Sequence, residues 1–208
     1  MGKILYERQY SERRRYDPIL DYLLPSFSLS IPQNAVILDA GSFNGKAASD
    51  LHYRLEELNP KIICLDIKFG RKAKNQALTF LKGNYVDTIF PNDSIDVIFM
   101  CNNISYEIIR SKYAYSTPGK IRQRLGEAVR ILAPGGFIVI QSDNHDMPTF
   151  ILIKDSKGCI SYTADKDSYK HYVEFMEPGM ALYHASKVDA DLKVAKRISE
   201  ALNECSEQ

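Results

Sequence analysis

The chain has 208 residues, of which 45% are hydrophobic and 25% are charged, a composition ordinary for a globular domain with a full core. Lysine and arginine together number 27 against 26 aspartate and glutamate residues, so the formal net charge is only +1. This balance gives no reason to expect nucleic acid or an anionic membrane as a partner. We therefore expect one domain spanning residues 1–208.

The four cysteines predict neither a zinc site nor a disulfide framework, because they lie far apart and form no C-x-x-C pair. No apolar run approaches the roughly 20 residues needed to cross a bilayer. Residues 1–25 also lack the apolar block of a signal peptide. We therefore expect a cytoplasmic protein without a bound metal.

Residues 1–32 predict an N-terminal helical segment. Apolar side chains recur at helical spacing among charges over residues 3–24, and Pro18 is a place where a second helix could start. A proline- and serine-rich stretch, residues 25–32, ends the pattern. Three side chains of this segment are candidates for a lid over a ligand, although ordinary packing is the stronger interpretation: Tyr10, Arg14 and Tyr16.

The stretch VILDAGSFNG, residues 36–45, reads as a buried strand that breaks into a loop containing glycine. Asp39 ends the apolar run, Gly41 permits a sharp turn, and from Asn44 the apolar spacing becomes helical. A strand, a glycine turn and a helix N-terminus form the geometry in which α/β proteins hold nucleotide-like ligands. The sequence therefore predicts a ligand loop here.

Further strands alternate with helices along residues 33–142. The predicted strands are residues 61–66, 77–82, 95–101 and 137–140, with a helix at 120–132 that Pro134-Gly135-Gly136 ends. Residues 68–76 are too poorly patterned to predict a helix. Such alternation indicates a parallel sheet with right-handed crossovers, which binds ligands at its carboxyl edge.

The remaining residues, 143–208, predict C-terminal strands and a helix. Residues 150–154 and 159–163 form a predicted hairpin, residues 172–175 add a possible strand, and residues 188–202 carry the apolar stripe of a final helix. That stripe fits packing on the domain better than a dimer surface. A homodimer stays open, because the sequence does not fix the oligomeric state.

Four motifs of residues 36–140 occur in the order found in the class I S-adenosylmethionine-dependent methyltransferases. VILDAGSFNG resembles the family's strand followed by D-x-G-x-G-x-G, and ICLDIK resembles the acidic end of its second strand. GNYVDTIFPNDSIDVIF resembles the loop into strand four, and AVRILAPGGFIVI the helix stop before strand five. The chain resembles this family over half its length.

This resemblance implies an α/β fold: a Rossmann-like three-layer α/β/α sandwich whose mostly parallel sheet ends in an antiparallel hairpin. It also implies a methyltransferase that uses S-adenosylmethionine. The implied cofactor-binding residues are Asp39, Gly41, Ser42, Phe43, Gly45, Asp66, Ile67, Asn84, Tyr85 and Asn102.

Individual roles follow from the same resemblance. Gly41 would let the backbone approach the methionine part of the cofactor. Asp66 would accept hydrogen bonds from both ribose hydroxyls, and Asn84 and Tyr85 would meet the adenine edge. Asn102 would lie beside the methionine moiety. The alternative for Asp39 and Asp66 is a cap on the following helix.

Departures from the family pattern are also informative. Phe43 replaces the middle glycine of the loop motif, so either the loop is wider or the ring packs beside the cofactor. Asn84 stands where the family often has aspartate, and residues 66–83 are short for a strand-helix-strand unit, so the second crossover is expected to be a loop.

Two rival nucleotide sites fit the same loop less well. A dinucleotide fingerprint starting at Gly41 would need glycines where Phe43 and Lys46 stand. A phosphate-binding loop ending at Lys46 would need a serine or threonine where Ala47 stands, to ligate Mg²⁺.

His145, in the run SDNHD after the fifth predicted strand, is the candidate catalytic base, with Asp143 and Asp146 able to orient it or to join it around a metal. The alternative is a polar surface loop. Methyl transfer from a sulfonium needs positioning more than a base.

Three functions remain open at this level. A methyltransferase acting on a small-molecule acceptor fits the motifs and the near-neutral charge best. A catalytically silent cofactor-binding or partner subunit would explain Phe43. An RNA or protein methyltransferase would use the basic residues of 13–15 and 68–74 as its electrostatic surface.

Overall fold

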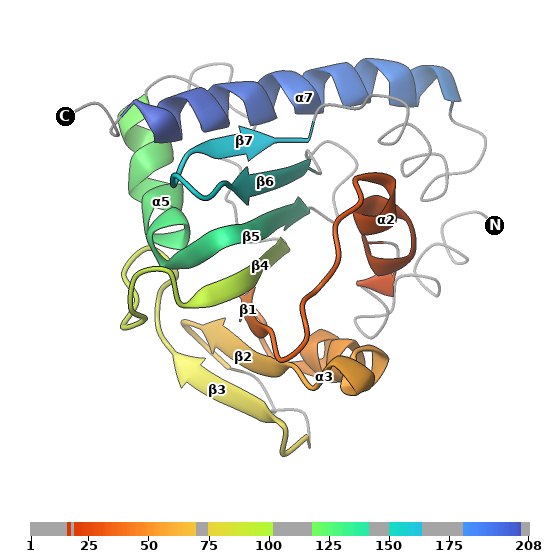
Figure 1. Cartoon of the computed structure of the whole chain (residues 1–208), viewed down its shortest axis with the longest axis vertical. Coiled ribbons are helices and arrows are strands. Elements are labelled where there is room, and N and C mark those ends of the chain that lie inside the picture. The colour runs from red at the N-terminus through yellow and green to blue at the C-terminus, as the bar shows by residue number, and fades with distance from the viewer. Residues whose placement is uncertain are drawn as a thin grey trace.

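A seven-stranded sheet organises the chain, in the spatial order β3-β2-β1-β4-β5-β6-β7 (Figure 1). The computed structural model describes residues 16–17, 19–69, 75–101, 118–141, 150–163 and 181–204. Within this part of the chain, no helix is both long enough and apolar enough to cross a membrane.

The strands are β1 (Val36–Ala40), β2 (Lys61–Asp66), β3 (Leu78–Lys82), β4 (Ile95–Cys101), β5 (Leu132–Gln141), β6 (Phe150–Lys154) and β7 (Ile160–Tyr162). The first five are parallel to one another, whereas β6 pairs antiparallel with β5 and β7 antiparallel with β6. The predicted parallel sheet with a C-terminal antiparallel hairpin is therefore confirmed. The carboxyl ends of β1, β2 and β4 meet at one edge.

The helices are η1 (Ile19–Leu23, a π-helix), α2 (Leu24–Ser26), α3 (Lys46–Arg54), η2 (Glu56–Leu58, a 3₁₀-helix), α5 (Pro118–Ile131) and α7 (Ala181–Asn203). The helix predicted at 120–132 is present with ends shifted by one or two residues. The last helix begins earlier than the predicted residue 188. The strand predicted at 172–175 lies outside the described residues.

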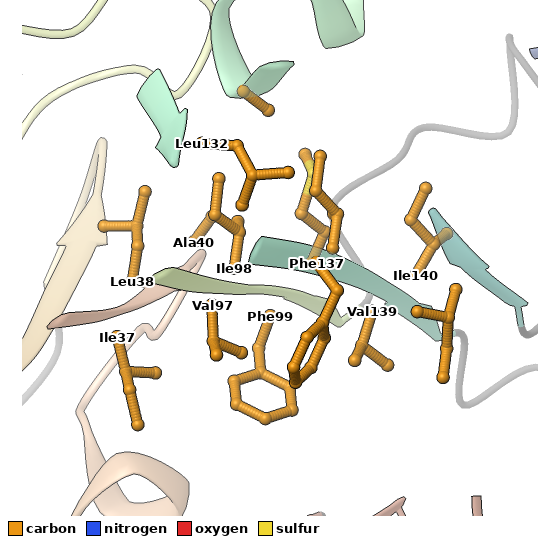
Figure 2. Close-up of a cluster of buried hydrophobic side chains, with 14 of the residues drawn as sticks. Ile37, Leu38, Ala40, Val97, Ile98, Phe99, Leu132, Phe137, Val139 and Ile140 are labelled. Atoms are coloured by element: carbon orange, nitrogen blue, oxygen red, sulfur yellow. The ribbon is translucent and has the colours of Figure 1, made fainter. Parts of the chain in front are cut away.

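The parallel strands form the centre of the core, and their side chains alternate between the two faces of the sheet (Figure 2). Ile37, Val97 and Phe99 point to one face, and Leu38 and Ile98 to the other; all five are at most 1% exposed. Since both faces are covered, each strand reads in the sequence as a continuous apolar run. The structure is thus the three-layer sandwich that the sequence predicted.

The fifth strand differs from its predicted bounds of 137–140. β5 begins at Leu132, which pairs with Ile95, and regular pairing resumes between Phe137 and Val97. Between these two pairs, residues 133–136 of β5 lie opposite Asp96 alone, so the Pro-Gly-Gly run forms an irregularity inside the strand. The prediction was wrong about where the strand starts. The strand pairs with β4 both before and after the Pro-Gly-Gly run, so it begins before that run and not after it.

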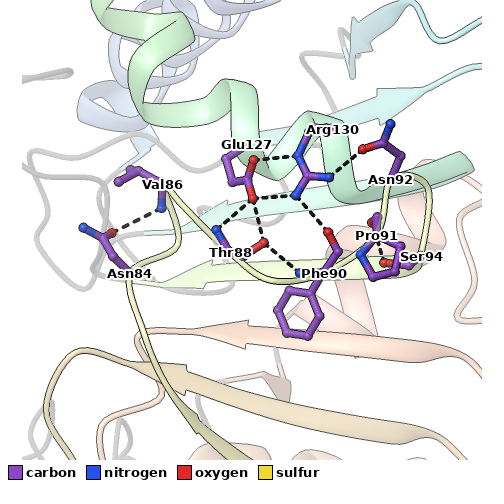
Figure 3. A network of polar contacts seen from close by, with 9 residues as sticks. All are labelled: Asn84, Val86, Thr88, Phe90, Pro91, Asn92, Ser94, Glu127 and Arg130. Carbon is purple, nitrogen blue, oxygen red and sulfur yellow. Dashed lines mark hydrogen bonds and ion pairs between the residues drawn. The ribbon is translucent and has the colours of Figure 1, made fainter.

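The loop between β3 and β4 is held against α5 by a network around Glu127 (Figure 3). The carboxylate of Glu127 accepts hydrogen bonds from the backbone N–H and the hydroxyl of Thr88, at 2.8 and 2.7 Å. It also accepts bonds from Nε and Nη2 of Arg130, both at 2.7 Å. Arg130 in turn donates to the carbonyl of Phe90 at 2.8 Å. These bonds fix the path of the chain into β4.

This network makes the stability of the protein depend on pH in the acid range. The hydrogen bond from Arg130, with smaller contributions from Thr88, lowers the pKa of Glu127 to about 2 against the opposing effect of burial. Because the pKa of Glu127 is lower in the folded state, its stabilising contribution is complete above about pH 4.5 and is lost as the pH falls towards 2. As the pH falls through this interval, we expect the free energy of unfolding, measured in urea, to decrease less for Glu127→Gln than for the wild type.

The matched control for that measurement is Glu57→Gln, which changes an exposed glutamate of η2. It should leave the acid dependence as in the wild type. Equal pH slopes for the wild type and Glu127→Gln would contradict the assignment.

Candidate functional site

The loop of residues 41–45 lies at the carboxyl edge of the sheet, between β1 and α3. The N–H of Gly41 donates to the carbonyl of Leu65 at 2.6 Å, which draws the loop across the end of β2. Gly41 has φ of +79°, in the left-handed region that glycine adopts without a steric cost. The turn predicted after Asp39 is therefore present, and its backbone is bonded to Leu65, the residue before Asp66.

Asp66 ends β2 with its carboxylate held by two backbone amides. Oδ2 accepts the N–H of Phe43 at 2.8 Å, and Oδ1 accepts the N–H of Lys68 at 2.9 Å. A carboxylate has about four lone-pair sites, so both oxygens retain capacity to accept further donors. Asp66 is half-buried, which gives it access to solvent while the two amides fix its orientation.

Two residues next to Asp66, one through a backbone hydrogen bond and one in sequence, expose large apolar side chains. Phe43 is 51% exposed and Ile67 is 67% exposed. Phe43 also has φ of +49°, which is uncommon for a residue with a side chain. This conformation lets its N–H reach Asp66. The sequence identified Phe43 as an irregularity, but nothing in the sequence indicated that its backbone orients the acidic residue.

Gly45 has a packing role that the sequence did not reveal. A Cβ at this position would lie 2.7 Å from two ring atoms of Phe80 in β3 and 3.4 Å from Sγ of Cys64 in β2. Its φ of +73° is also in the left-handed region. The absence of a side chain therefore lets the start of α3 pack closely onto the sheet.

The first amide of α3 is bonded by a side chain of the preceding loop. Oδ1 of Asn44 accepts the N–H of Lys46 at 3.0 Å, and Asn44 is 8% exposed. Gly45 stands at the N-cap position of α3 and has no side chain to cap it, so the alternative role of Asp39 and Asp66 as helix caps stays a prediction. Asp66 uses its carboxylate on the loop and on Lys68.

Asp39 is buried, with 1% exposure, and faces the N-terminal segment. Its Oδ1 accepts the hydroxyl of Tyr16 at 2.7 Å. Burial, together with the negative charge of Asp39 and against the effect of Ser42, raises the pKa of the neighbouring Cys64 thiol to about 12. Cys64 therefore stays protonated, and it serves as a fully buried core residue.

The turn after β3 reaches the same edge of the sheet. The N–H of Gly83 donates to the backbone carbonyl of Asp66 at 3.0 Å, which brings Asn84 and Tyr85 next to the end of β2. Oδ1 of Asn84 accepts the N–H of Val86 at 3.2 Å. Tyr85 is half-buried, and burial raises its pKa. Both side chains thus have local structural roles beside any contact with a ligand.

The predicted residues of the 41–45 loop, Asp66 and Ile67 are brought together at this edge, with Asn84 and Tyr85 adjacent. Asn102 and His145 lie outside the described residues. In the described part of the chain, no three His, Cys, Asp or Glu side chains are grouped as a metal site would require.

A cavity of about 650 Å³ lies at the opposite edge of the sheet, among α5, the β6–β7 turn and the start of β5. Its lining includes Arg122, Arg130, Lys154 and Lys157. Nζ of Lys154 donates to Asp93 and to two backbone carbonyls, and Arg130 is bound to Glu127. These two cations hold the fold together at that edge, which is remote from Asp66.

No protein-family model matches the sequence, and no curated protein matches it. Among solved structures, a similar one belongs to a protein from Methanococcus maripaludis that carries a provisional assignment as an S-adenosyl-L-methionine-dependent methyltransferase. The two share 15% identity with a TM-score of 0.50, over 98% of this chain and 82% of that one.

Two further similar structures cover less of the chain. An S-adenosylmethionine-dependent methyltransferase from Methanosarcina mazei matches with 18% identity and a TM-score of 0.39, over 53% of each chain. Geranyl diphosphate C-methyltransferase from Streptomyces coelicolor matches with 15% identity and a TM-score of 0.47, over 67% of this chain and 48% of that one. The present chain thus spans about half the length of these two proteins. From its sheet order and its likeness to the Methanococcus protein, the chain has the Rossmann-like fold of the S-adenosylmethionine-dependent methyltransferases.

Proposed function

We propose that the protein is an S-adenosylmethionine-dependent methyltransferase that acts on a small-molecule acceptor. The observation that carries this proposal is the oriented carboxylate of Asp66 at the carboxyl edge of the sheet, with the exposed Phe43 bonded to it through its backbone and the exposed Ile67 next in the chain. A fixed carboxylate suits a pair of hydroxyl donors, and exposed apolar side chains suit the faces of a purine ring.

The described residues fit an adenosine-containing cofactor. Both oxygens of Asp66 have remaining acceptor capacity, which the two ribose hydroxyls would use. Phe43 and Ile67 would lose water-exposed apolar surface against the adenine, and such burial is favourable by roughly 25 cal/mol per Å². Gly41 has no side chain, so the methionine part would be able to approach the backbone of the loop there.

When bound, the cofactor supplies a methyl group on a positively charged sulfur, which is already activated for displacement. The chain itself has to position the two reactants, and positioning can lower the activation barrier by about 7–11 kcal/mol. Asp66 would hold the ribose and the 41–45 loop would set the depth of the methionine part. His145 stays the proposed general base for an acceptor that must lose a proton.

The small-molecule acceptor is favoured by the balanced charge of the chain, +1 overall, which provides no strong electrostatic attraction for a polymer of phosphates. Geranyl diphosphate, the ligand of one similar structure, is an acceptor of this class for that protein. For the present chain we propose the class and not the compound.

Calorimetry tests this function. We expect S-adenosylhomocysteine to bind the wild-type protein, and Asp66→Ala to weaken that binding by about 1–3 kcal/mol, as the loss of a hydrogen-bonding carboxylate does. Glu57→Ala is the matched control, since it removes an exposed carboxylate in η2, away from the loop. It should bind as the wild type does.

The outcomes separate the alternatives. If neither S-adenosylmethionine nor S-adenosylhomocysteine binds the wild-type protein, the proposal is contradicted. Binding without methyl transfer to any small molecule of a cell extract would favour the silent subunit. Salt-dependent binding of RNA, with methyl transfer to it, would favour the RNA methyltransferase instead.

A further inference from the structure

Tyr16 connects the N-terminal segment to the central strands of the sheet. Its side chain is almost fully buried, with 2% exposure. The ring packs on Phe99 of β4 with centroids 4.6 Å apart, and the hydroxyl donates to Oδ1 of Asp39 in β1 at 2.7 Å. Asp39 and Phe99 are register partners on neighbouring strands, so one tyrosine side chain contacts both.

The same segment is fixed at the far end of α3. Arg54, the last residue of α3, pairs with Asp17 at 3.2 Å and with Asp21 at 2.5 Å. Tyr16 precedes Asp17, and its backbone carbonyl accepts the N–H of Leu20 at 3.0 Å, as in the first turn of a helix. Tyr16 therefore contacts the end of β1, and Asp17 and Asp21 contact the end of α3; β1 and α3 are the two elements that flank the 41–45 loop.

The contact with Asp39 is the one that bears on the loop. Asp39 is buried, and a buried carboxylate is costly unless it is hydrogen-bonded. A phenol hydroxyl bonded to a carboxylate at this distance is a strong, charge-assisted bond. Asp39 lies only two residues before Gly41, whose backbone must hold its left-handed turn for the loop to reach Leu65.

We propose that Tyr16 is a positioning residue for the cofactor: by holding the Asp39 carboxylate, it fixes the start of the 41–45 loop and couples the N-terminal segment to cofactor binding. This inference rests on the proposed function. Without the hydroxyl, Asp39 has one donor fewer and gains by turning towards water at the carboxyl edge, which disturbs Gly41. The ligand must then order the loop as it binds, and this cost weakens affinity.

The test compares Tyr16→Phe with two controls. Ile19→Val trims a fully buried side chain of the same segment and makes no change at Asp39, so it matches the general loss of packing. Tyr53→Phe removes a hydroxyl from a tyrosine of α3 that is 61% exposed. We expect Tyr16→Phe to weaken S-adenosylhomocysteine binding about five- to tenfold, and both controls to bind within about twofold of the wild type.

Two further measurements distinguish positioning from loss of stability. In an Asp39→Asn background, Tyr16→Phe should cost much less affinity than it does alone, because the charge that the hydroxyl holds is absent. In the protein without ligand, hydrogen exchange at the Gly41 amide should accelerate in Tyr16→Phe and not in Ile19→Val.

Each outcome has a separate meaning. If the wild type binds and Tyr16→Phe binds equally well, the inference fails while the proposed function stands. If Ile19→Val loses as much affinity as Tyr16→Phe, the role of Tyr16 is structural and the inference is overturned. If the wild type does not bind, the proposed function fails and so does the role towards a cofactor; the exchange data then report only the link between Tyr16 and the loop.

Discussion

Replacing Gly45 by alanine is expected to destabilise the protein by about 2–5 kcal/mol, which is a large part of the stability of an ordinary domain. Two costs add. A residue with a side chain in the left-handed region costs roughly 1–2 kcal/mol, and Gly45 has φ of +73°. The new Cβ would also lie 2.7 Å from the ring of Phe80, and such overpacking typically costs about 1–3 kcal/mol. Urea unfolding measures the sum.

Gly135 separates the two costs. It has φ of +82°, but a Cβ there would meet no atom within 4 Å, so Gly135→Ala should cost only the backbone strain. Adding Phe80→Leu to Gly45→Ala should recover about 1 kcal/mol or more relative to the sum of the single changes, since the shorter side chain removes the clash. Equal destabilisation by Gly45→Ala and Gly135→Ala would mean that the Phe80 ring moves aside at little cost.

Replacing Lys154 by methionine is expected to destabilise the protein by about 2–3 kcal/mol, because two backbone carbonyls lose their charged donor. Lys154 is 8% exposed, and its Nζ donates to the carbonyls of Val129 and Leu132 at 2.9 and 2.7 Å. These carbonyls lie where α5 passes into β5, and a cation there also interacts favourably with the helix dipole. Methionine keeps most of the apolar volume, so the loss reports the ammonium group.

Asp93→Asn is the matched change on the other side of this ion pair. The carboxylate of Asp93 accepts from Nζ of Lys154 at 2.6 Å, but its side chain is 50% exposed. Because water screens a half-exposed partner, the cost should stay below about 1 kcal/mol. If Lys154→Met cost no more than Asp93→Asn, the bonds from Lys154 to the two carbonyls would contribute nothing beyond the ion pair.

The sequence predicted the turn after β1 and the strands around it well for a local physical reason. A parallel strand covered on both faces must be apolar throughout, so β1, β2 and β4 can be recognised in the sequence as short apolar runs. A left-handed turn favours glycine, so Gly41 marks the place where β1 ends. The carboxyl-edge rule of parallel sheets then brings Asp66 to the loop without any knowledge of its contacts.

Contacts between distant parts of the chain were not predictable in this way. Tyr16 and Asp39 are 23 residues apart, and nothing in the spacing of the N-terminal segment says that its tyrosine reaches a carboxylate in the sheet. The start of β5 at Leu132 depends on pairing with Ile95, which outweighs the local tendency of Pro-Gly-Gly to end an element. At this position the local sequence pattern predicts a later start of β5 than the strand pairing allows, and the pairing determines where β5 begins.

The sequence by itself determined the element order, the central loop and the identity of the acidic residue at the end of β2, because burial period and turn chemistry act over a few residues. Only the tertiary structure decided what those residues do to one another. It assigns Gly45 to packing against Phe80, Phe43 to orienting Asp66 through its backbone, and Tyr16 to holding Asp39. Each of these depends on how strands and helices distant in sequence pack together, and periodicity along the chain carries no record of that packing.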